Sequence, residues 1–476
     1  MTETPPALDL RTGPQRTFLH LLLSTLVVSV INFTVWFAVT FWVYLETRSV
    51  FATGLISGIF LVSIAGTGIW FGSLVDHHHK KTVMQWSAAV SLLLYVACLA
   101  LHLTTPEATF RDPGSLRLWV FVVVLMLGVV AGNLRTIAMP TLVTLLIPAD
   151  RRDRANGLVG TATGLSFLVT SVISGLLVAA GGMYYVLLLA IGVLALALLH
   201  LATVRVPETR PVRLARGEDG AGVDLRGTVR LVRAVPGLVA LIAFSCFNNF
   251  LGGSFMALMD AYGLSLVSVQ VWGLLWGVLS AFVILGGLVV ARVGLGRNPV
   301  RTLLLVNLVL WTVTALFPIR SSIVLLAGGM AVFMLMMPFA EAAEQTVLQK
   351  VVPFERQGRV FGFAQSVEQA ASPLTAFLMG PIAQFLVIPF MTDGWGADTL
   401  GPWFGTGAER GLALVFTVTG VLGLLTTLLA LRSRSYRRLS QSFAGPDDGD
   451  DADGHRIVDQ PGDGVDPHAP EVPVGP

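Results

Sequence analysis

The sequence has little charge for its length. Only 13% of its 476 residues are Asp, Glu, Lys or Arg, whereas 54% are hydrophobic. A water-soluble chain of this length would need much more charge on its surface. The composition therefore excludes an ordinary soluble protein and predicts a helical protein that crosses the membrane several times.

Lysine is almost absent. It occurs only at positions 80, 81 and 350, and none of the three lies in the Gly-Lys-Ser/Thr sequence of a phosphate-binding loop. We therefore expect no ATP hydrolysis, no enzymatic activity, no cofactor and no bound metal. Every other basic residue is arginine, which, with the abundant Ala, Gly and Val, indicates a GC-rich bacterial genome.

Cysteine is also scarce. Cys98 and Cys246 both lie inside apolar runs, so we expect reduced thiols and no disulfide framework. A cleavable signal peptide is not expected either, because the first apolar run, residues 18–45, is far longer than the hydrophobic region of a signal peptide.

Apolar runs long enough to cross a bilayer, about 20 residues each, recur along the chain. Polar or charged segments separate them, and an Asp-, Gly- and Pro-rich tail follows the last run. We predict twelve transmembrane helices, at residues 18–45, 50–75, 82–103, 118–147, 155–180, 184–204, 236–262, 266–290, 300–317, 321–349, 359–390 and 411–431.

The segments between these spans differ in basic charge. The N-terminus, the segments after the even-numbered spans and the C-terminal side together carry 25 Lys and Arg, whereas the opposite segments carry 5. Because basic segments stay in the cytoplasm, the count predicts a multi-pass protein of the cytoplasmic (inner) cell membrane with both termini in the cytoplasm.

One charged segment occurs twice, 205 positions apart. Residues 148–157 and 353–362 both have a proline, an acid two residues later, arginines three and six residues later and a glycine nine residues later. Gly175 and Gly380 keep the same offset. The chain thus has two halves of one plan. We predict a disordered N-terminus at residues 1–16, six-helix bundles at 17–206 and 236–436, a cytoplasmic loop at 207–235 and a disordered acidic cytoplasmic tail at 437–476.

The loop after the second span is the most specific motif. Gly72-x-x-x-Asp76 followed by Lys80 and Lys81 resembles the signature loop of the major facilitator superfamily, and a weaker copy at 287–297 has Ala291 in place of the acid. The loops after the fourth and tenth spans, with residues 365–381, are similar to the macrolide-efflux-like branch of the drug:proton antiporters. The resemblance covers residues 16–436. It implies an all-α membrane protein with twelve transmembrane helices in two pseudo-symmetric six-helix bundles.

The sequence also departs from the family pattern. Position 79 is histidine where the family loop usually has glycine, and the fifth span lacks the Gly-Pro signature of many antiporters. The first span has Asn32 at its centre and no carboxylate.

Ionisable residues inside spans cost about 2.5 to 3.5 kcal/mol at a span centre, so they are candidates for function. Arg135, Glu341, Glu344 and Glu368 are such residues. The resemblance implies that the fourth and tenth spans face one cavity. Position 340, which lies 205 residues after Arg135, is next to Glu341. We therefore predict that Arg135 pairs with Glu341 or Glu344 and that proton binding there is coupled to substrate. A static ion pair between the two helices is the alternative.

Other polar residues are candidates for contact with substrate or for hydrogen bonds between helices. They share helix faces with the ionisable residues or fall at matching positions of the first and seventh spans. They are Asn32, Asn248, Asn249, Met337 and Gln345.

Asp76 has a second predicted role. At the end of its helix it can face the N-terminus of the helix that begins near Arg359, where free amide groups favour an anion. The resemblance implies a latch that closes the cytoplasmic side; topological anchoring by the lysines is the alternative. The predicted gate comprises Gly72, Asp76, Lys80, Lys81, Asp150, Arg151, Arg154, Glu355, Arg356 and Arg359. Three adjacent histidines, 77–79, rarely converge on one ion, so we expect no metal site there.

Taken together, these features predict a monomeric bacterial exporter of an amphipathic, drug-like compound, driven by proton antiport and alternating access. Its partners would be membrane lipid, a small-molecule substrate and protons, and not nucleic acid. Export of a siderophore or other metabolite, lysolipid flipping, and a scaffold or sensor without transport remain alternatives.

Overall fold

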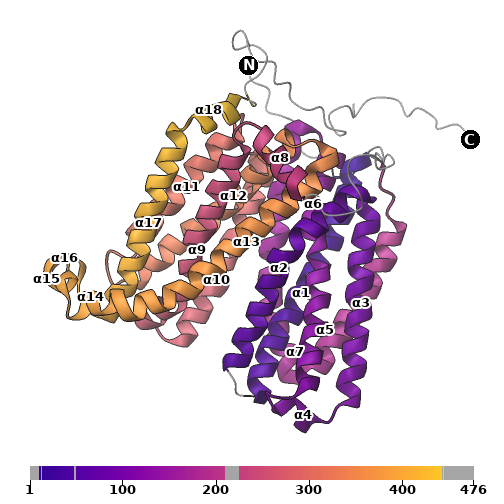
Figure 1. The fold of residues 1–476 in the computed structure, drawn as a ribbon, viewed down its shortest axis with the longest axis horizontal. Coiled ribbons are helices and arrows are strands. Elements are labelled where there is room, and N and C mark those ends of the chain that lie inside the picture. The colour runs from indigo at the N-terminus through magenta and orange to yellow at the C-terminus, as the bar shows by residue number, and fades with distance from the viewer. Residues whose placement is uncertain (1–9, 12, 48–49, 209–224, 442, 444–476) are drawn as a thin grey trace, which may run out of the picture.

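The computed structural model describes residues 10–11, 13–47, 50–208, 225–441 and 443. Within these residues all regular secondary structure is helical, and two groups of long helices lie side by side (Figure 1). In the described part of the chain, ten helical segments are long and apolar enough to cross a membrane. Two more long helical segments, α2 and residues 152–180 of α7, stand where the second and fifth spans are predicted. The predicted all-α membrane architecture is therefore confirmed.

The first half is built from the helices that precede residue 204. It consists of α1 (Gly13–Thr47), α2 (Val50–His77), α3 (Lys80–Thr104), α4 (Glu107–Arg111), α5 (Leu116–Gly132), α6 (Leu134–Leu146), the 3-10 turn η1 (Ala149–Arg151) and α7 (Arg152–Thr203).

Three predicted spans of the first half differ in detail from the helices. The fourth span is interrupted at Asn133, whose side chain and carbonyl both accept hydrogen bonds from the Thr136 hydroxyl. The fifth and sixth spans form α7, which reverses direction at Gly181 and Gly182. Gly182 has φ +62°, a conformation that costs glycine little and other residues more.

The second half follows the segment between the bundles. It consists of α9 (Leu238–Leu266), α10 (Val269–Val293), α11 (Pro299–Leu316), α12 (Ile323–Val351), η2 (Phe354–Arg356), α13 (Gln357–Ile382), the π-helical η3 (Ala383–Val387), α14 (Ile388–Thr392), α15 (Trp395–Thr399), α16 (Gly401–Phe404) and α17 (Ala408–Arg432).

Two short helices lie where the sequence predicted a loop and a disordered tail. In α8 (Leu225–Ala234), Thr228 and Val232 are buried one turn apart and the arginines are exposed. In α18 (Arg434–Gln441), Leu439 is buried. This spacing of apolar residues is that of an amphipathic surface helix. Helix α1 also starts at Gly13, inside the predicted disordered N-terminus. Apart from residues 10–11 and 443, the rest of the predicted disordered segments lies outside the described residues.

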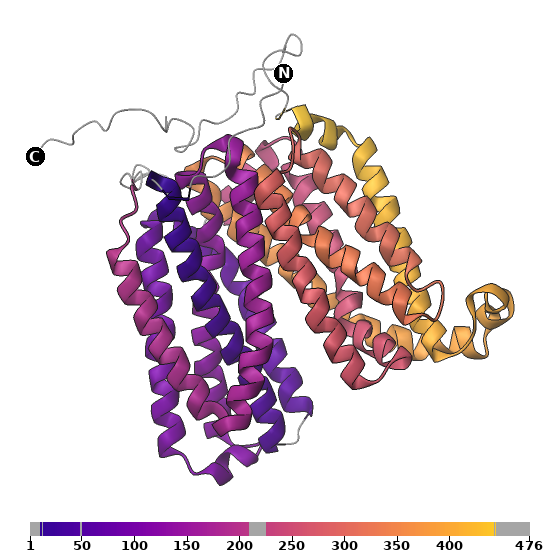
Figure 2. The same cartoon turned by 180° about the vertical axis from the view of Figure 1, so that it is seen from behind.

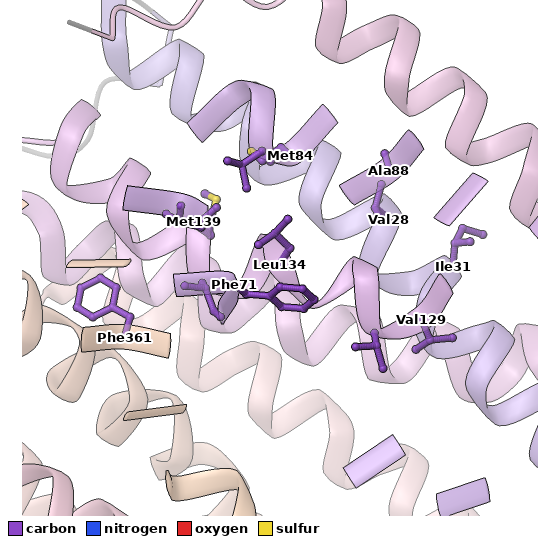
Figure 3. Packing of buried hydrophobic residues seen from close by; sticks show 14 of the residues in the cluster. Val28, Ile31, Phe71, Met84, Ala88, Val129, Leu134, Met139 and Phe361 are labelled. Atoms are coloured by element: carbon purple, nitrogen blue, oxygen red, sulfur yellow. The ribbon is translucent and has the colours of Figure 1, made fainter. Parts of the chain in front are cut away.

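The two halves meet at one end of the molecule and diverge toward the other (Figures 1 and 2). We call the first the charged end, because it carries segments 78–79, 148–151, 294–298 and 353–356, and the second the open end. A single hydrophobic cluster extends from the first half into α12 and α13. In Figure 3, Phe361 of α13 lies beside Met139 and Phe71 of the first half. The helices at the open end of the second half have a separate core.

The repeated charged segment has the same hydrogen bonds in both copies. Arg152 donates to the carbonyls of Thr144 and Ile147 at 3.2 Å each. Gln357 donates to the carbonyls of Gln349 and Val352 at 3.1 Å each. All three pairs of equivalent positions differ by 205. The buried side chain thus satisfies carbonyls that the end of the preceding helix leaves without partners.

Candidate functional site

A cavity of about 710 Å³ lies between the halves, and nearly all of its wall comes from the second half. The volume is that of a site for a drug-sized molecule. Phe167 of α7 is its only described wall residue from the first half. Eleven of the 23 described wall residues are aromatic or contain sulfur: Phe167, Phe244, Phe255, Phe317, Phe333, Trp276, Trp311, Met259, Met330, Met334 and Met337.

The charged residues of the described wall are all acidic. They are Asp260 on α9 and Glu341 and Glu344 on α12. The Asp260 carboxylate accepts a hydrogen bond from the Trp272 indole at 2.9 Å. Glu341 is exposed to the cavity, one helical turn from Glu344. The cavity therefore presents carboxyl groups on an apolar surface.

Glu344 lies close to a second carboxyl group behind the wall. Its side chain interacts with Glu368 of α13 and with Ser245 of α9. Two neighbouring carboxylates repel each other, which disfavours ionisation of both groups at once. The arrangement is thus a candidate site for one proton between α12 and α13.

Arg135 lies elsewhere. It is 1% exposed, within the first half, and donates to the Ser24 hydroxyl at 3.1 Å and the Met84 carbonyl at 3.2 Å. The predicted pair of Arg135 with Glu341 or Glu344 is absent from this conformation. The physical reason is local: α1 and α3 supply acceptors for the guanidinium, while the glutamates face a cavity on the other half.

The other predicted cavity residues divide between the two halves. Asn248, Asn249 and Met337 line the cavity, and the side-chain amide oxygen of Asn248 accepts a hydrogen bond from the Trp311 indole at 2.7 Å. Asn32 instead lies in the first half and accepts from the Tyr95 hydroxyl at 2.8 Å. Gln345 is not among the wall residues, and its buried side-chain oxygen has no partner within the described part of the chain.

Asp76 joins the halves at the charged end. Its two carboxylate oxygens accept from the backbone amides of Gly358 at 2.6 Å and Arg359 at 2.9 Å, in the first turn of α13. The Arg359 guanidinium lies 3.8 Å from the same carboxylate. Free amides at a helix N-terminus favour an anion, so this contact stabilises closure of the charged end. We call the Asp76 contact with Gly358 and Arg359 the latch.

Asp153 makes the equivalent contact on the opposite side. Its carboxylate accepts from the backbone amide of Leu295 at 2.7 Å, in the loop after α10, and from the amide of Arg154 at 2.7 Å. That loop is the weaker copy of the signature loop, in which Ala291 replaces the acid. In this contact the acid lies on the helix that faces the loop. Sequence reasoning missed Asp153, although the loss of the acid at position 291 was a signal that its partner should be sought elsewhere.

Glycines allow the helices to cross closely at these two contacts. A Cβ atom at Gly72 or Gly362 would overlap a carbonyl oxygen of the facing helix, at Gly358 and Gly68 respectively. A Cβ at Gly157 would lie 2.5 Å from the amide nitrogen of Ala291. The glycine that ends each repeated segment is therefore at a helix crossing between the halves.

A buried amide pair also connects the halves. Asn156 donates to Gln349 and to the Thr346 hydroxyl, both at 2.9 Å. Gln349 donates in turn to the carbonyl of Pro140 at 3.1 Å. These bonds bind α7, α12 and α6 together at the charged end.

The remaining predicted gate residues surround these contacts. Lys80 is buried, with its ammonium 5.1 Å from the centre of the Phe354 ring. The Lys80 and Lys81 amides both donate to Glu208, the last described residue before the segment between the bundles. Arg154 is buried, Asp150 and Glu355 are exposed, Arg151 lies 3.6 Å from Asp150, and Arg356 is half-buried.

The three adjacent histidines point to three different partners. His77 bonds the Ser73 carbonyl and the Arg359 guanidinium. His78 bonds the Leu74 carbonyl and packs on Trp86, and His79 lies 3.3 Å from Glu208. The rings therefore do not converge on one point.

Comparison with known proteins agrees with this geometry. The sequence model of the Major Facilitator Superfamily matches residues 21–376. Macrolide efflux protein A of Streptococcus pyogenes is 21% identical over 352 residues, which cover 72% of this chain and 83% of that protein. An outward-facing bacterial homologue of the iron transporter ferroportin superposes with a TM-score of 0.64 at 14% identity, covering 88% of this chain and 100% of the other. The proton:xylose symporter XylE, bound to 6-bromo-6-deoxy-D-glucose, gives 0.63 at 14% identity, covering 88% and 96%.

Proposed function

The chain belongs to the major facilitator superfamily, and we propose that it is a secondary active transporter that exports an amphipathic organic cation in exchange for protons. The observation that carries the proposal is an apolar cavity with an acidic wall, behind which the Glu344 side chain interacts with Glu368. The efflux proteins of similar sequence support the direction of transport.

The distribution of basic residues supports an orientation in the membrane. The segments at the charged end belong to the set that carries 25 Lys and Arg residues, whereas the segments on the opposite side of the membrane carry 5. Basic segments stay in the cytoplasm, so the charged end would face the cytoplasm and the cavity would open to the outside. In this orientation the conformation is the outward-open one, in which substrate leaves and protons enter.

The cavity wall supports the substrate class. Aromatic rings and methionine sulfurs attract apolar and cationic groups alike, and an aromatic face stabilises a cation by roughly 0.5 to 2 kcal/mol. Glu341 adds a negative charge that substrate can reach. No basic side chain lines the described wall, so an anionic compound would meet repulsion without compensation.

The carboxyl pair supports proton coupling. With a proton between them, Glu344 and Glu368 carry one negative charge fewer beside the cavity. A cation bound at Glu341 would favour loss of that proton, because an opposite charge nearby stabilises the ionised form of a carboxyl group. Proton and substrate would therefore compete for the second half of the protein, which is the requirement for antiport.

Vesicle transport tests this function. Purified protein is reconstituted into liposomes, and tetraphenylphosphonium uptake is measured with and without an inside-acid pH gradient, while potassium and valinomycin hold the membrane potential at zero. Antiport predicts uptake above that of protein-free vesicles, only with the gradient and abolished by a protonophore. Equal uptake with and without the gradient would exclude proton coupling, and uptake no greater than in protein-free vesicles would favour a scaffold or sensor.

A further inference from the structure

His77 stands at the junction of the two halves, beside the latch. It is the last residue of α2, and its ring lies between that helix and α13. Nδ1 lies 2.7 Å from the carbonyl oxygen of Ser73, and Nε2 lies 2.9 Å from the Arg359 guanidinium. Asp76, the residue before it, accepts the amides of Gly358 and Arg359.

These two contacts determine the protonation state of the ring. A carbonyl oxygen can only accept, so Nδ1 must carry the hydrogen that it donates to Ser73. A guanidinium can only donate, so Nε2 must be the bare nitrogen that accepts from Arg359. The contact with α13 therefore requires a neutral imidazole in the Nδ1–H form.

We propose that His77 is a pH-sensitive element that weakens closure of the charged end when its imidazole binds a proton. A proton on Nε2 would replace the only acceptor that Arg359 finds on this ring. It would also place two positive charges at hydrogen-bonding distance, where they repel even though water around the exposed His77 ring weakens the repulsion. Histidine is the side chain that most often serves as a pH-sensitive element in proteins.

Charged groups on three elements surround this contact. Asp76 lies on the same helix as His77 and Arg359 on α13, while Lys80 at the start of α3 interacts with Asp76, Glu208 and Glu355. The Asp76 carboxylate already accepts two amides and lies 3.8 Å from the Arg359 guanidinium. Protonation of His77 would therefore add a cation beside Arg359.

The proposal goes beyond the transport function and does not depend on the substrate. In the proposed orientation, His77 samples cytoplasmic pH. Proton import by antiport would acidify that compartment, protonate His77 and destabilise the outward-open state. The switch would thus act as negative feedback on proton entry.

The test measures the distance across the charged end directly. Spin labels are placed by Ala149→Cys and Arg301→Cys, at exposed positions of the first and second halves, with Cys98 and Cys246 replaced by alanine. Pulsed electron resonance of the full-length protein in lipid nanodiscs then gives the ratio of open to closed charged ends. Between about pH 8 and about pH 6 we expect this ratio to rise about fivefold or more.

Variants at the neighbouring histidines separate His77 from every other titrating group. Glutamine can accept from Arg359 but binds no proton near neutral pH, so His77→Gln should remove the rise, whereas His78→Gln should keep it. His77→Arg, with a permanent charge, should open the charged end at both pH values. An unchanged response in His77→Gln, or no response in the unsubstituted histidine background, overturns the proposal. A response that arises at Glu344 and Glu368 would persist in His77→Gln.

Discussion

The side chains of Glu344 on α12 and Glu368 on α13 interact beside the cavity. Because two neighbouring carboxylates repel each other, the pair favours one proton, and it joins the two helices that precede and follow the second repeated charged segment. No equivalent carboxyl pair occurs in the first half, as far as residues 13–47 and 50–208 describe it. The two halves share the repeated charged segment and its helices, but the carboxyl pair lies in the second half.

Glu341 should determine the charge preference of the cavity. Because it is the cavity carboxylate exposed one turn from Glu344, Glu341→Gln should weaken tetraphenylphosphonium binding about tenfold, equivalent to about 1.4 kcal/mol. Quenching of the fluorescence of Trp276 and Trp311, which line the cavity, reports binding. Tetraphenylborate, of the same shape and opposite charge, is the control and should bind the variant no more weakly than the wild type. Unchanged cation affinity in the variant would contradict this role.

The two acid contacts at the charged end should contribute similarly to closure. Hydrogen bonds to a charged group are worth about 1.5 to 3 kcal/mol each, so Asp76→Asn and Asp153→Asn should each raise the open fraction roughly tenfold or more. The spin-label distance across the charged end measures it. Asp150→Asn is the matched control, because Asp150 is exposed and pairs with Arg151 of its own turn. If Asp153→Asn behaves like Asp150→Asn, the second contact has no role in closure.

The repeated glycines provide a steric test. Gly157→Ala and Gly362→Ala introduce a methyl group into a helix crossing between the halves and should shift the protein away from the closed charged end, with loss of transport. Gly175→Ala and Gly380→Ala, which share the same 205 offset but have open space around the added carbon, should transport normally. Vesicle flux at equal reconstituted amounts compares the four variants. Full transport by Gly157→Ala and Gly362→Ala would show that the close crossings are dispensable.

Arg135 and Glu341 should act independently. Arg135→Gln removes donors to Ser24 and Met84 and should lower thermal stability by itself. Because the two residues lie on different halves without contact, the double variant with Glu341→Gln should equal the sum of the single variants within about 0.5 kcal/mol. Thermal unfolding in detergent measures all four corners of the cycle. A coupling energy above about 1 kcal/mol would instead support the predicted ion pair between Arg135 and Glu341.

Periodicity and charge were sufficient to predict the long helices, because these depend on local sequence. The contact of Asp76 with α13 joins distant parts of the chain, and it was predicted from the preference of a helix N-terminus for an anion and from the resemblance to the family. The break at Asn133 and the helix α8 were not predicted, since Asn133 lies in a continuous apolar run and the arginines of α8 concealed its short apolar stripe. The partner of Arg135 could not be derived from the 205 offset. Equivalent positions of the two halves face each other only where the halves are in contact. The guanidinium of Arg135 instead donates to the Ser24 hydroxyl and the Met84 carbonyl, which lie in its own half.

Proton release on substrate binding tests the central claim most directly. Tetraphenylphosphonium is added to the purified protein in weakly buffered solution near neutral pH, and the change in pH is converted to protons per bound cation. The account predicts release from the wild type, and binding without release from the variant carrying both Glu344→Gln and Glu368→Gln, because the shared proton is then missing. Binding by the wild type without release, or equal release from the double variant, would contradict it.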